Sequence, residues 1–317
     1  MTGRTGIRLW VAVVVIPLLV SCTPSVRLPG PLTGAPALSD DHFLARDGAR
    51  LPLKSWLPDR GRPSAVIIAL HGFNDYSNFF ATPGSWLAAR GIASYAYDQR
   101  GFGAAPGRGY WPGTAALIDD LTSLIELIRD RHPETPVYLL GESMGAAVIM
   151  VATTGDRPAL NVAGVILSAP AVWGRSTMPW YQTTALWLSA HTMPGLTLTG
   201  RGLKIVASDN RQMLLALGRD PLVINKTRID TLYGLTGLMD AALAAAADLK
   251  LPSLILYGKQ DQIIPKEPTE RMLASLPIDT SGRRKIVTYE NGYHMLLRDL
   301  QAEVVWSDIA DWVGGGL

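Results

Sequence analysis

One short stretch of the chain has the residue types and spacing of a nucleophile turn. Ser143 is the centre of Gly141-Glu142-Ser143-Met144-Gly145, which follows the apolar run 137–140 and precedes a small-residue helical pattern over 146–152. A strand, sharp turn and helix in this order hold a serine hydroxyl exposed in a strained turn, and the two glycines let strand and helix approach closely. The pattern alone is a weak signal, but its context makes Ser143 the candidate nucleophile.

A histidine must accept the proton of that serine, and an acid must fix the tautomer of the histidine. In hydrolases with this kind of turn, the acid and then the histidine follow the serine along the chain. Of five histidines, only His191 and His294 follow Ser143. His191 lies in an aromatic-rich stretch, whereas His294 lies just beyond the last predicted strand. His294 is therefore the predicted base, and a purely structural loop histidine is the alternative.

The acid is expected at the end of an earlier strand. Asp261 follows the apolar run 253–257 by four residues, so it is the predicted partner of the histidine. The alternative is an Asx-turn or a cap, which is common for Asp in loops. Asp209, Asp220 and Glu290 are weaker candidates for the same role.

An acyl-transfer site also needs donors for the negatively charged oxygen of the tetrahedral intermediate. In this architecture, one is the backbone N–H after the nucleophile and the other comes from the loop after an earlier strand. These are the amides of Met144 and of Phe73, since His71-Gly72-Phe73 follows the buried-strand pattern 66–70. We expect His71 to brace this loop rather than take part in the chemistry.

The elements that must position these residues alternate between strand and helix patterns. Arg46-Asp47-Gly48 separates two short segments over 43–57, as in a hairpin. Predicted strands are 66–70, 93–97, 137–140, 165–167, 253–257 and 285–289, and predicted helices are 86–89, 117–128, 146–152 and 304–313. The expected fold class is α/β, with a mostly parallel sheet covered by helices on both faces.

The strand pattern stops between residues 172 and 249, within a domain expected over 41–317. Helical patterns occur around 213–217 and 232–247, so we expect a helical cap above the carboxyl edge of the sheet, where ligands bind in such folds. The cap is rich in large apolar residues, which either form its own core or line an acyl-binding wall: Trp173, Met178, Trp180, Tyr181, Trp187 and Met193.

The amino terminus has the pattern of an export signal. Arg4 and Arg8 precede the apolar run 9–20, which is too short for a bilayer span, so residues 1–21 are expected to be a cleaved signal peptide. Leu-Val-Ser-Cys22 resembles the lipobox of bacterial lipoproteins. Cys22 is the only cysteine, which excludes an intramolecular disulfide, and it is the predicted lipid attachment site, with an incidental cysteine as the alternative. The expected location is the bacterial cell envelope.

Residues 22–40 are rich in Pro, Gly and Ser and are expected to be a flexible tether.

Composition limits the remaining function classes. The chain has 317 residues, 48% hydrophobic and 18% charged, which argues against disorder. Its 29 basic and 27 acidic residues are balanced once Arg4 and Arg8 are removed, so no nucleic-acid partner is indicated. No metal motif, phosphate loop or dinucleotide turn is present, and no cofactor or metal is expected.

From about residue 43 to the end, the chain resembles an α/β-hydrolase of the monoacylglycerol lipase and lysophospholipase group, which is similar to serine aminopeptidases of family S33. The resemblance rests on segments in family order: His71-Gly72, 98–103, 141–145, the Asp261 segment and 292–294, with 208–210 and 220–222 resembling its cap. The family usually has a serine soon after the Asp-x-Arg-Gly-x-Gly turn, but this chain has Ala104-Ala105-Pro106 there.

This resemblance implies that the chain hydrolyses acyl esters through an acyl-enzyme, with small lipids such as monoacylglycerols or lysophospholipids as substrates. The predicted lipid anchor on Cys22 adds a membrane as the expected partner. An aminopeptidase-like amide hydrolase is one alternative. A non-catalytic lipoprotein that binds a lipid or an envelope component is another. The oligomeric state stays open.

Overall fold

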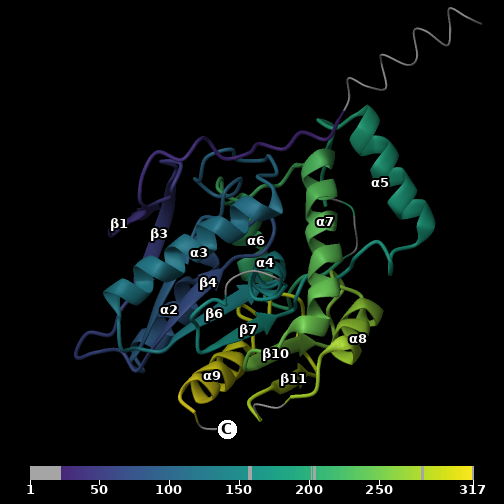
Figure 1. Ribbon diagram of the computed structural model, residues 1–317. Helices are drawn as coiled ribbons and strands as arrows, with labels where there is room; N and C mark the ends of the chain where they lie inside the picture. The colour runs from purple at the N-terminus through teal and green to yellow at the C-terminus, as the bar shows by residue number, and fades with distance from the viewer. Residues whose placement is uncertain (1–22, 156–158, 201, 203–204, 280–281, 316–317) are drawn as a thin grey trace, which may run out of the picture.

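A nine-stranded sheet forms the centre of the computed structural model (Figure 1), which describes residues 23–155, 159–200, 202, 205–279 and 282–315. The predicted signal peptide and Cys22 lie outside these residues. The sheet has the order β1-β2-β3-β5-β4-β6-β7-β10-β11. Its strands are β1 (Ala37–Leu38), β2 (His42–Leu44), β3 (Arg50–Trp56), β4 (Ala65–Leu70), β5 (Ile92–Tyr97), β6 (Val137–Glu142), β7 (Gly164–Ser168), β10 (Ser253–Gly258) and β11 (Lys285–Tyr289).

Within this sheet, β5, β4, β6, β7, β10 and β11 all run parallel, and β3 joins β5 antiparallel. Every residue of β4, β5, β6, β7 and β10 is buried, as expected for apolar strands covered on both faces. The predicted hairpin is present as β2 and β3. The predicted fold class is confirmed.

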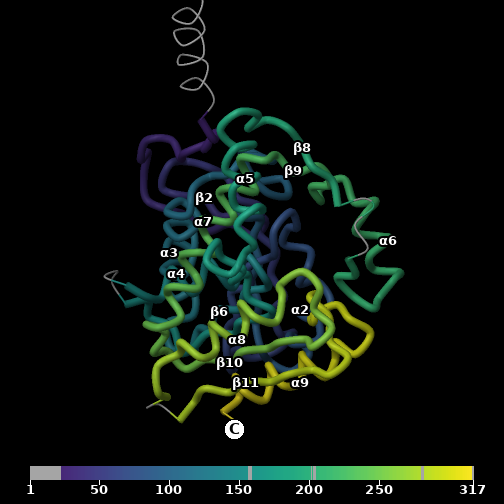
Figure 2. Tube along the Cα trace, turned by 90° about the vertical axis from the view of Figure 1, so that its right-hand side faces the viewer, coloured from purple at the N-terminus to yellow at the C-terminus, as the bar shows by residue number. Residues whose placement is uncertain are grey.

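Two helical layers cover the sheet (Figures 1 and 2). On one face, α3 (Thr114–Arg131), α4 (Met144–Ala152), α7 (Ile229–Ala245) and α8 (Lys266–Ser275) share one apolar core. On the other face, α2 (Ala81–Ala88) and α9 (Ala302–Val313) share a second core, which includes Trp312. The carboxyl ends of the parallel strands therefore meet at one edge, between these layers.

The segment between β7 and β10 contains α5 (Trp180–Thr192), β8 (Thr197–Leu198), α6 (Arg211–Arg219), β9 (Thr227–Arg228), α7 and a short 3₁₀ helix (Ala246–Asp248). The sequence pattern predicted a cap over the whole range 172–249, but only part of this segment is separate from the main helical layers. Leu235, Leu238 and Met239 of α7 pack in the same core as α4, so the end of this segment belongs to the main helical layer.

The segment expected to be a flexible tether is extended but lies against the domain. Val26 forms a bridge with Trp111, and the N–H of Ser25 donates to Asp230 at the start of α7. Further along, the N–H of Gly30 donates to Asp47, and that of Thr33 to the carbonyl of Arg46. These backbone groups find partners on the body, which holds the segment along its surface.

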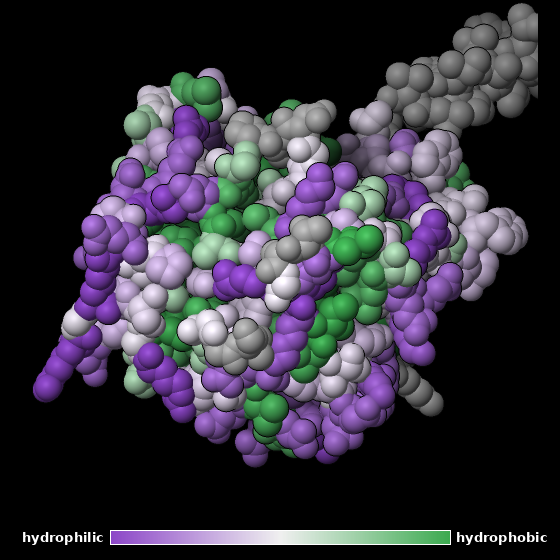
Figure 3. Space-filling view, turned by 60° about the horizontal axis from the view of Figure 1, so that its bottom comes forward, coloured by the Kyte–Doolittle hydropathy of each residue, from purple (hydrophilic) through white to green (hydrophobic). Residues whose placement is uncertain are grey.

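The surface at the end of the molecule that carries α9 and β11 mixes hydrophilic and hydrophobic residues (Figure 3). No helix in the described part of the chain is long and apolar enough to cross a membrane.

Candidate active site

Ser143 sits in a strained turn between β6 and α4. Its φ of 54° and ψ of −111° are unusual for a residue with a side chain. Both neighbouring glycines are needed there. A Cβ on Gly141 would collide with the backbone of α4, and one on Gly145 with the carbonyl of Leu70. The strained turn predicted from the sequence is therefore present.

His294 and Asp261 are in direct contact. His294 Nδ1 lies 2.8 Å from Asp261 Oδ2, and the Asp261 side chain is fully buried. Because a carboxylate accepts, the histidine holds its proton on Nδ1 and leaves Nε2 as an acceptor. Asp261 Oδ1 also accepts from the N–H groups of Ile263 and Ile264, so one carboxylate forms the Asx-turn and bonds the histidine.

The loops after β10 and β11 bring this pair together, because the N–H of Lys259 donates to the carbonyl of Tyr289, and that of Gln260 to Gly292. Ser143 and His294 are both almost buried, with 8% and 5% of their surface exposed. No hydrogen bond joins these two side chains in the described structure. Such bonds are often long without substrate and tighten when it binds.

The weaker candidates make other contacts. His191 stacks on Trp187 in α5, and Glu290 pairs with Lys259 on the surface. Asp209 accepts from the N–H of Leu300, and Asp220 accepts from the hydroxyl of Tyr76. Of the acids considered from the sequence, Asp261 is the one that bonds His294.

The loop that carries Phe73 lies directly against the nucleophile. A Cβ on Gly72 would lie 3.5 Å from the Cβ of Ser143. Neither the Phe73 nor the Met144 amide donates a hydrogen bond within the described part of the chain, so both remain available to a ligand. Catalytic roles for these amides, as for Ser143, Asp261 and His294, stay predictions at this point.

His71 holds this loop in place, as the sequence suggested. The N–H of Gln99 donates to His71 Nε2 at 2.9 Å, so the proton lies on Nδ1, which donates to the carbonyl of Gly72. The Gln99 side chain also donates to the carbonyl of His71. Burial lowers the pKa of His71, which favours this neutral form.

A buried ion cluster that the sequence did not reveal ties three segments together. Arg298 Nη2 lies 2.7 Å from Glu142 Oε1 and 2.7 Å from Asp75 Oδ2. Glu142 precedes Ser143, Asp75 belongs to the Phe73 loop, and Arg298 follows His294 by four residues. The guanidinium thus connects the nucleophile turn, the predicted oxyanion loop and the histidine loop. In the sequence, the one sign of this cluster is Glu142, the acid directly before the serine.

Burial and the attraction between opposite charges together set the pKa values in this cluster. Burial raises the pKa of Glu142, although the positive charge of Arg298 opposes the shift. For Arg298, burial alone would lower the pKa, but the attraction of Glu142 and Asp75 outweighs it, so the pKa is raised and the guanidinium stays charged. Asp299 is the next residue, and burial raises its pKa to about 6.

The motifs in the cap region join it to these loops. Asp299 accepts from the hydroxyl of Ser208 and from the N–H of Tyr293. Asn210 caps α6 and donates to the carbonyl of Arg298. On the other side, the carbonyl of Asn74 accepts from the N–H of Ile224. The cap therefore rests on both loops that flank the nucleophile.

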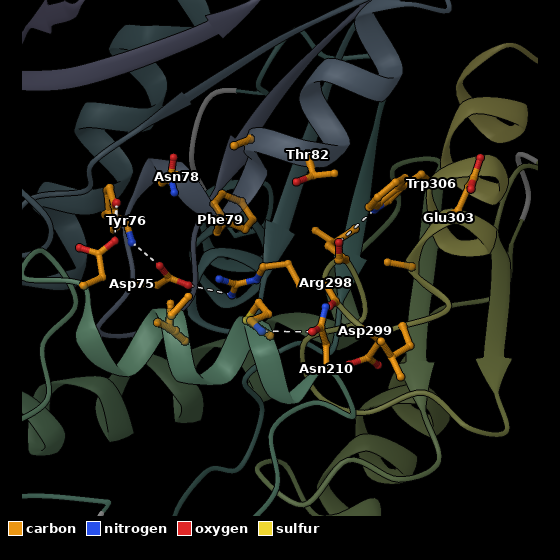
Figure 4. Close-up of a pocket in the computed structure, with 18 residues that line it drawn as sticks. Asp75, Tyr76, Asn78, Phe79, Thr82, Asn210, Arg298, Asp299, Glu303 and Trp306 are labelled. Carbon is orange, nitrogen blue, oxygen red and sulfur yellow. Dashed lines mark hydrogen bonds and ion pairs between the residues drawn. The ribbon is translucent and has the colours of Figure 1, made fainter.

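A cavity of about 490 Å³ opens beside the ion cluster. Figure 4 shows Arg298 pointing toward Asp75 across it, with Tyr76, Phe79 and Asn210 around them. Further acidic groups, among them Asp220, Asp299 and Glu303, line the same space, but neither Ser143 nor His294 is part of its wall. No cluster of three or more potential metal ligands occurs among the described residues.

The cap aromatics divide in a way that the sequence did not predict. Trp173 and Met178 are half-buried against the main core. Trp180, Tyr181 and Trp187 are exposed on α5, so they do not form a buried core of the cap.

Comparison with known proteins gives the family context. The sequence is 24% identical over 277 residues to a monoacylglycerol lipase of Mycolicibacterium smegmatis, covering 87% of this chain and 96% of that protein. It is 27% identical over 278 residues to a monoglyceride lipase of Rattus norvegicus, covering 86% of this chain and 89% of that protein.

Solved structures share the fold. A monoacylglycerol lipase of Paleococcus ferrophilus superposes with a TM-score of 0.69 at 23% identity, covering 84% of this chain and 99% of that one. A soluble variant of the monoglyceride lipase of Saccharomyces cerevisiae, in complex with a substrate analog, gives 0.72 at 20% identity, covering 91% and 98%. The sequence profile described as serine aminopeptidase, S33, matches residues 61–301. The chain therefore belongs to the serine aminopeptidase S33 family.

Proposed function

We propose that this serine carboxylic-ester hydrolase cleaves monoacylglycerols or lysophospholipids through Ser143, His294 and Asp261. The observation that carries the proposal is the buried bond between His294 and Asp261, in a loop joined by Arg298 to the strained turn of Ser143. The similarity to monoacylglycerol lipases over most of both chains supports the reaction class.

In the first half of the reaction, His294 Nε2 takes the hydroxyl proton of Ser143 as the serine oxygen bonds to the ester carbonyl carbon. The amides of Phe73 and Met144 stabilise the negative oxygen that develops. His294 then passes its proton to the departing alcohol, and an acyl-serine ester remains. Asp261 holds the histidine ring in the required tautomer and stabilises its positive charge.

In the second half, His294 takes a proton from water, and the resulting hydroxide equivalent attacks the acyl-serine carbonyl. The tetrahedral intermediate collapses with the proton returned to Ser143, which releases the carboxylic acid. The enzyme is restored without a cofactor.

We further propose that residues 1–21 direct export and that Cys22 carries a lipid anchor, so the enzyme meets its lipid substrates at a membrane of the cell envelope. The lipobox-like Leu-Val-Ser-Cys22 supports this location. Replacing Cys22 with Ser should release the protein from the membrane fraction, and continued retention would contradict the anchor.

A substrate panel tests the reaction. Wild type should hydrolyse monoacylglycerols or lysophospholipids and react with a fluorophosphonate probe at Ser143, whereas Ser143→Ala should lose both properties. Ser168→Ala, a buried serine at the end of the next strand, serves as the matched control and should keep labelling. Esterase activity unchanged in Ser143→Ala would overturn the proposal.

A second candidate is cleavage of amino-terminal residues from peptides. The acidic groups Asp220, Asp299 and Glu303 around the neighbouring cavity favour it, because a substrate ammonium needs such partners. Amino-acid amides and matched p-nitrophenyl esters, assayed side by side, separate the two functions. Faster amide cleavage would favour the peptidase.

A further inference from the structure

The outer side of α5 is an exposed apolar stripe. Trp180, Tyr181, Trp187 and Leu188 follow the spacing of one helical face, and each exposes more than half of its surface. The helix contains no Asp, Glu, Lys or Arg. On its inner side, Ala190 is fully buried and Thr183 and Leu186 are half-buried, so the stripe is the more exposed side of the helix.

The apolar surface continues past the end of α5. Met193, Leu196 and Leu198 are each about half exposed. The carbonyl of Leu196 accepts from the N–H of Ile229, which holds this segment at the start of α7. We refer to Trp180, Tyr181, Trp187, Leu188, Met193, Leu196 and Leu198 as the α5 surface.

The described chain begins beside this surface. The N–H of Ser25 donates to Asp230, in the first turn of α7, and the carbonyl of Pro194 accepts from the N–H of the same Asp230. Figures 1 and 2 both show the purple start of the chain at the end of the molecule formed by α5 and α7. Because Ser25 is fixed here, the preceding residues start from this end.

The distance from Cys22 to Ser25 is limited by the chain itself. Three residues span at most about 11 Å when fully extended. A lipid on Cys22 would therefore be attached within that reach of Ser25, which is itself bonded to Asp230. A free tether would let the domain move away from the membrane. The hydrogen bonds of residues 25–34 to the domain instead keep the start of the chain close to it.

We propose that the α5 surface docks onto the lipid bilayer to which Cys22 is anchored. Tryptophan and tyrosine side chains suit the interface between lipid tails and headgroups, and an uncharged helix face loses no ionic hydration when it inserts there. The orientation rests on the proposed lipid anchor, whereas the ester-hydrolase chemistry plays no part in it. The docked cap would face the lipid from which substrates come.

A local fluorescent probe tests the docking. Thr184 lies on the same stripe, is exposed and is not itself apolar, so Thr184→Cys leaves the α5 surface intact. In the lipidated full chain the sulfur of Cys22 is occupied, so a thiol-reactive NBD fluorophore labels position 184 alone. Gln301→Cys, exposed at the start of α9 on the far end, is the matched control. Each protein is reconstituted with phosphatidylcholine vesicles.

We expect NBD at position 184 to brighten about twofold or more and shift to the blue on vesicles, with position 301 unchanged. Replacing Trp180, Tyr181, Trp187 and Leu188 with Ser should abolish the response. The matched control carries Ser at four exposed apolar residues elsewhere on the surface, and it should keep the response: Leu57, Ile278, Leu300 and Val304.

Three results would overturn the proposal. If the protein binds vesicles but the NBD emission at position 184 remains the same as in water, the α5 surface does not dock although the anchor holds. Absence of lipid on Cys22 in the mature protein would remove the short reach on which the orientation rests. A blue shift without vesicles that grows with protein concentration would show that a second copy covers α5. None of these results depends on ester hydrolysis.

Discussion

Arg298 and Glu142 are 156 positions apart in sequence, yet the guanidinium donates to the buried carboxylate at 2.7 Å. The same Nη2 lies 2.7 Å from Asp75. Three loops that must be positioned to within a fraction of an ångström for acyl transfer therefore share one cation.

We predict that Arg298→Met costs about 3 to 5 kcal/mol of folding free energy, because it leaves Glu142 and Asp75 buried without a positive partner. Urea unfolding measures the loss. Adding Glu142→Gln to this variant should restore part of it, since one unpaired carboxylate is removed. Arg62→Met, which breaks the exposed pair with Glu134, is the control and should leave the unfolding midpoint unchanged. A loss no larger than that of the control would show that the cluster does not stabilise the fold.

We predict that Asp261→Asn lowers kcat about 10⁴-fold. The Asn carbonyl oxygen keeps the bonds from Ile263 and Ile264, and its NH₂ then faces His294 Nδ1. The neutral histidine then carries its proton on Nε2, so Nε2 can no longer accept the proton of Ser143. Steady-state hydrolysis of a p-nitrophenyl ester measures the effect, with Glu290→Gln as a surface control that should retain full activity. A loss below tenfold with the fold intact would argue against Asp261 as the orienting acid.

The contact between Asp261 and His294 could be predicted because each residue follows a recognisable apolar strand, and parallel strands end at one edge. The Arg298 cluster could not be predicted in this way, since its partners are paired only by the tertiary fold. The exposure of Trp187 could not be predicted from the sequence either. Aromatic residues in a helical pattern indicate burial as readily as a surface, and only the packing of α5 on α7 decides which side faces out.

We predict that His71→Phe destabilises the protein by about 1 to 3 kcal/mol, because the buried N–H of Gln99 loses its acceptor. The ring still fills the space against Phe102, so the loss reports the hydrogen bond more than the packing. The Phe73 loop should also loosen, which lowers kcat more than it raises KM. His132→Phe is the control on a half-buried histidine away from the site. An unchanged kcat would contradict a bracing role in catalysis.

The last prediction concerns Asp299, whose pKa burial raises from 3.8 to about 6. Between these values the folded protein keeps a proton that the unfolded chain has lost. The contribution of Asp299 to the free energy of unfolding is therefore greatest below about pH 4 and falls as the pH rises through 6. Each tenfold difference in proton affinity is worth about 1.4 kcal/mol. Asp299 borders the open cavity, where solvent screens its charge, so we expect a fall of about 2 kcal/mol.

Asp299→Asn isolates this effect. The amide can accept from the N–H of Tyr293 and donate to the hydroxyl of Ser208, so it keeps both contacts of the protonated acid. Relative to wild type, the variant should gain about 2 kcal/mol in unfolding free energy between pH 4 and pH 7, because it carries no charge to bury. All other titrating groups cancel in this difference. If the difference between variant and wild type stays constant over that range, Asp299 is ionised in the folded protein throughout, and the pKa shift assigned to its burial is wrong.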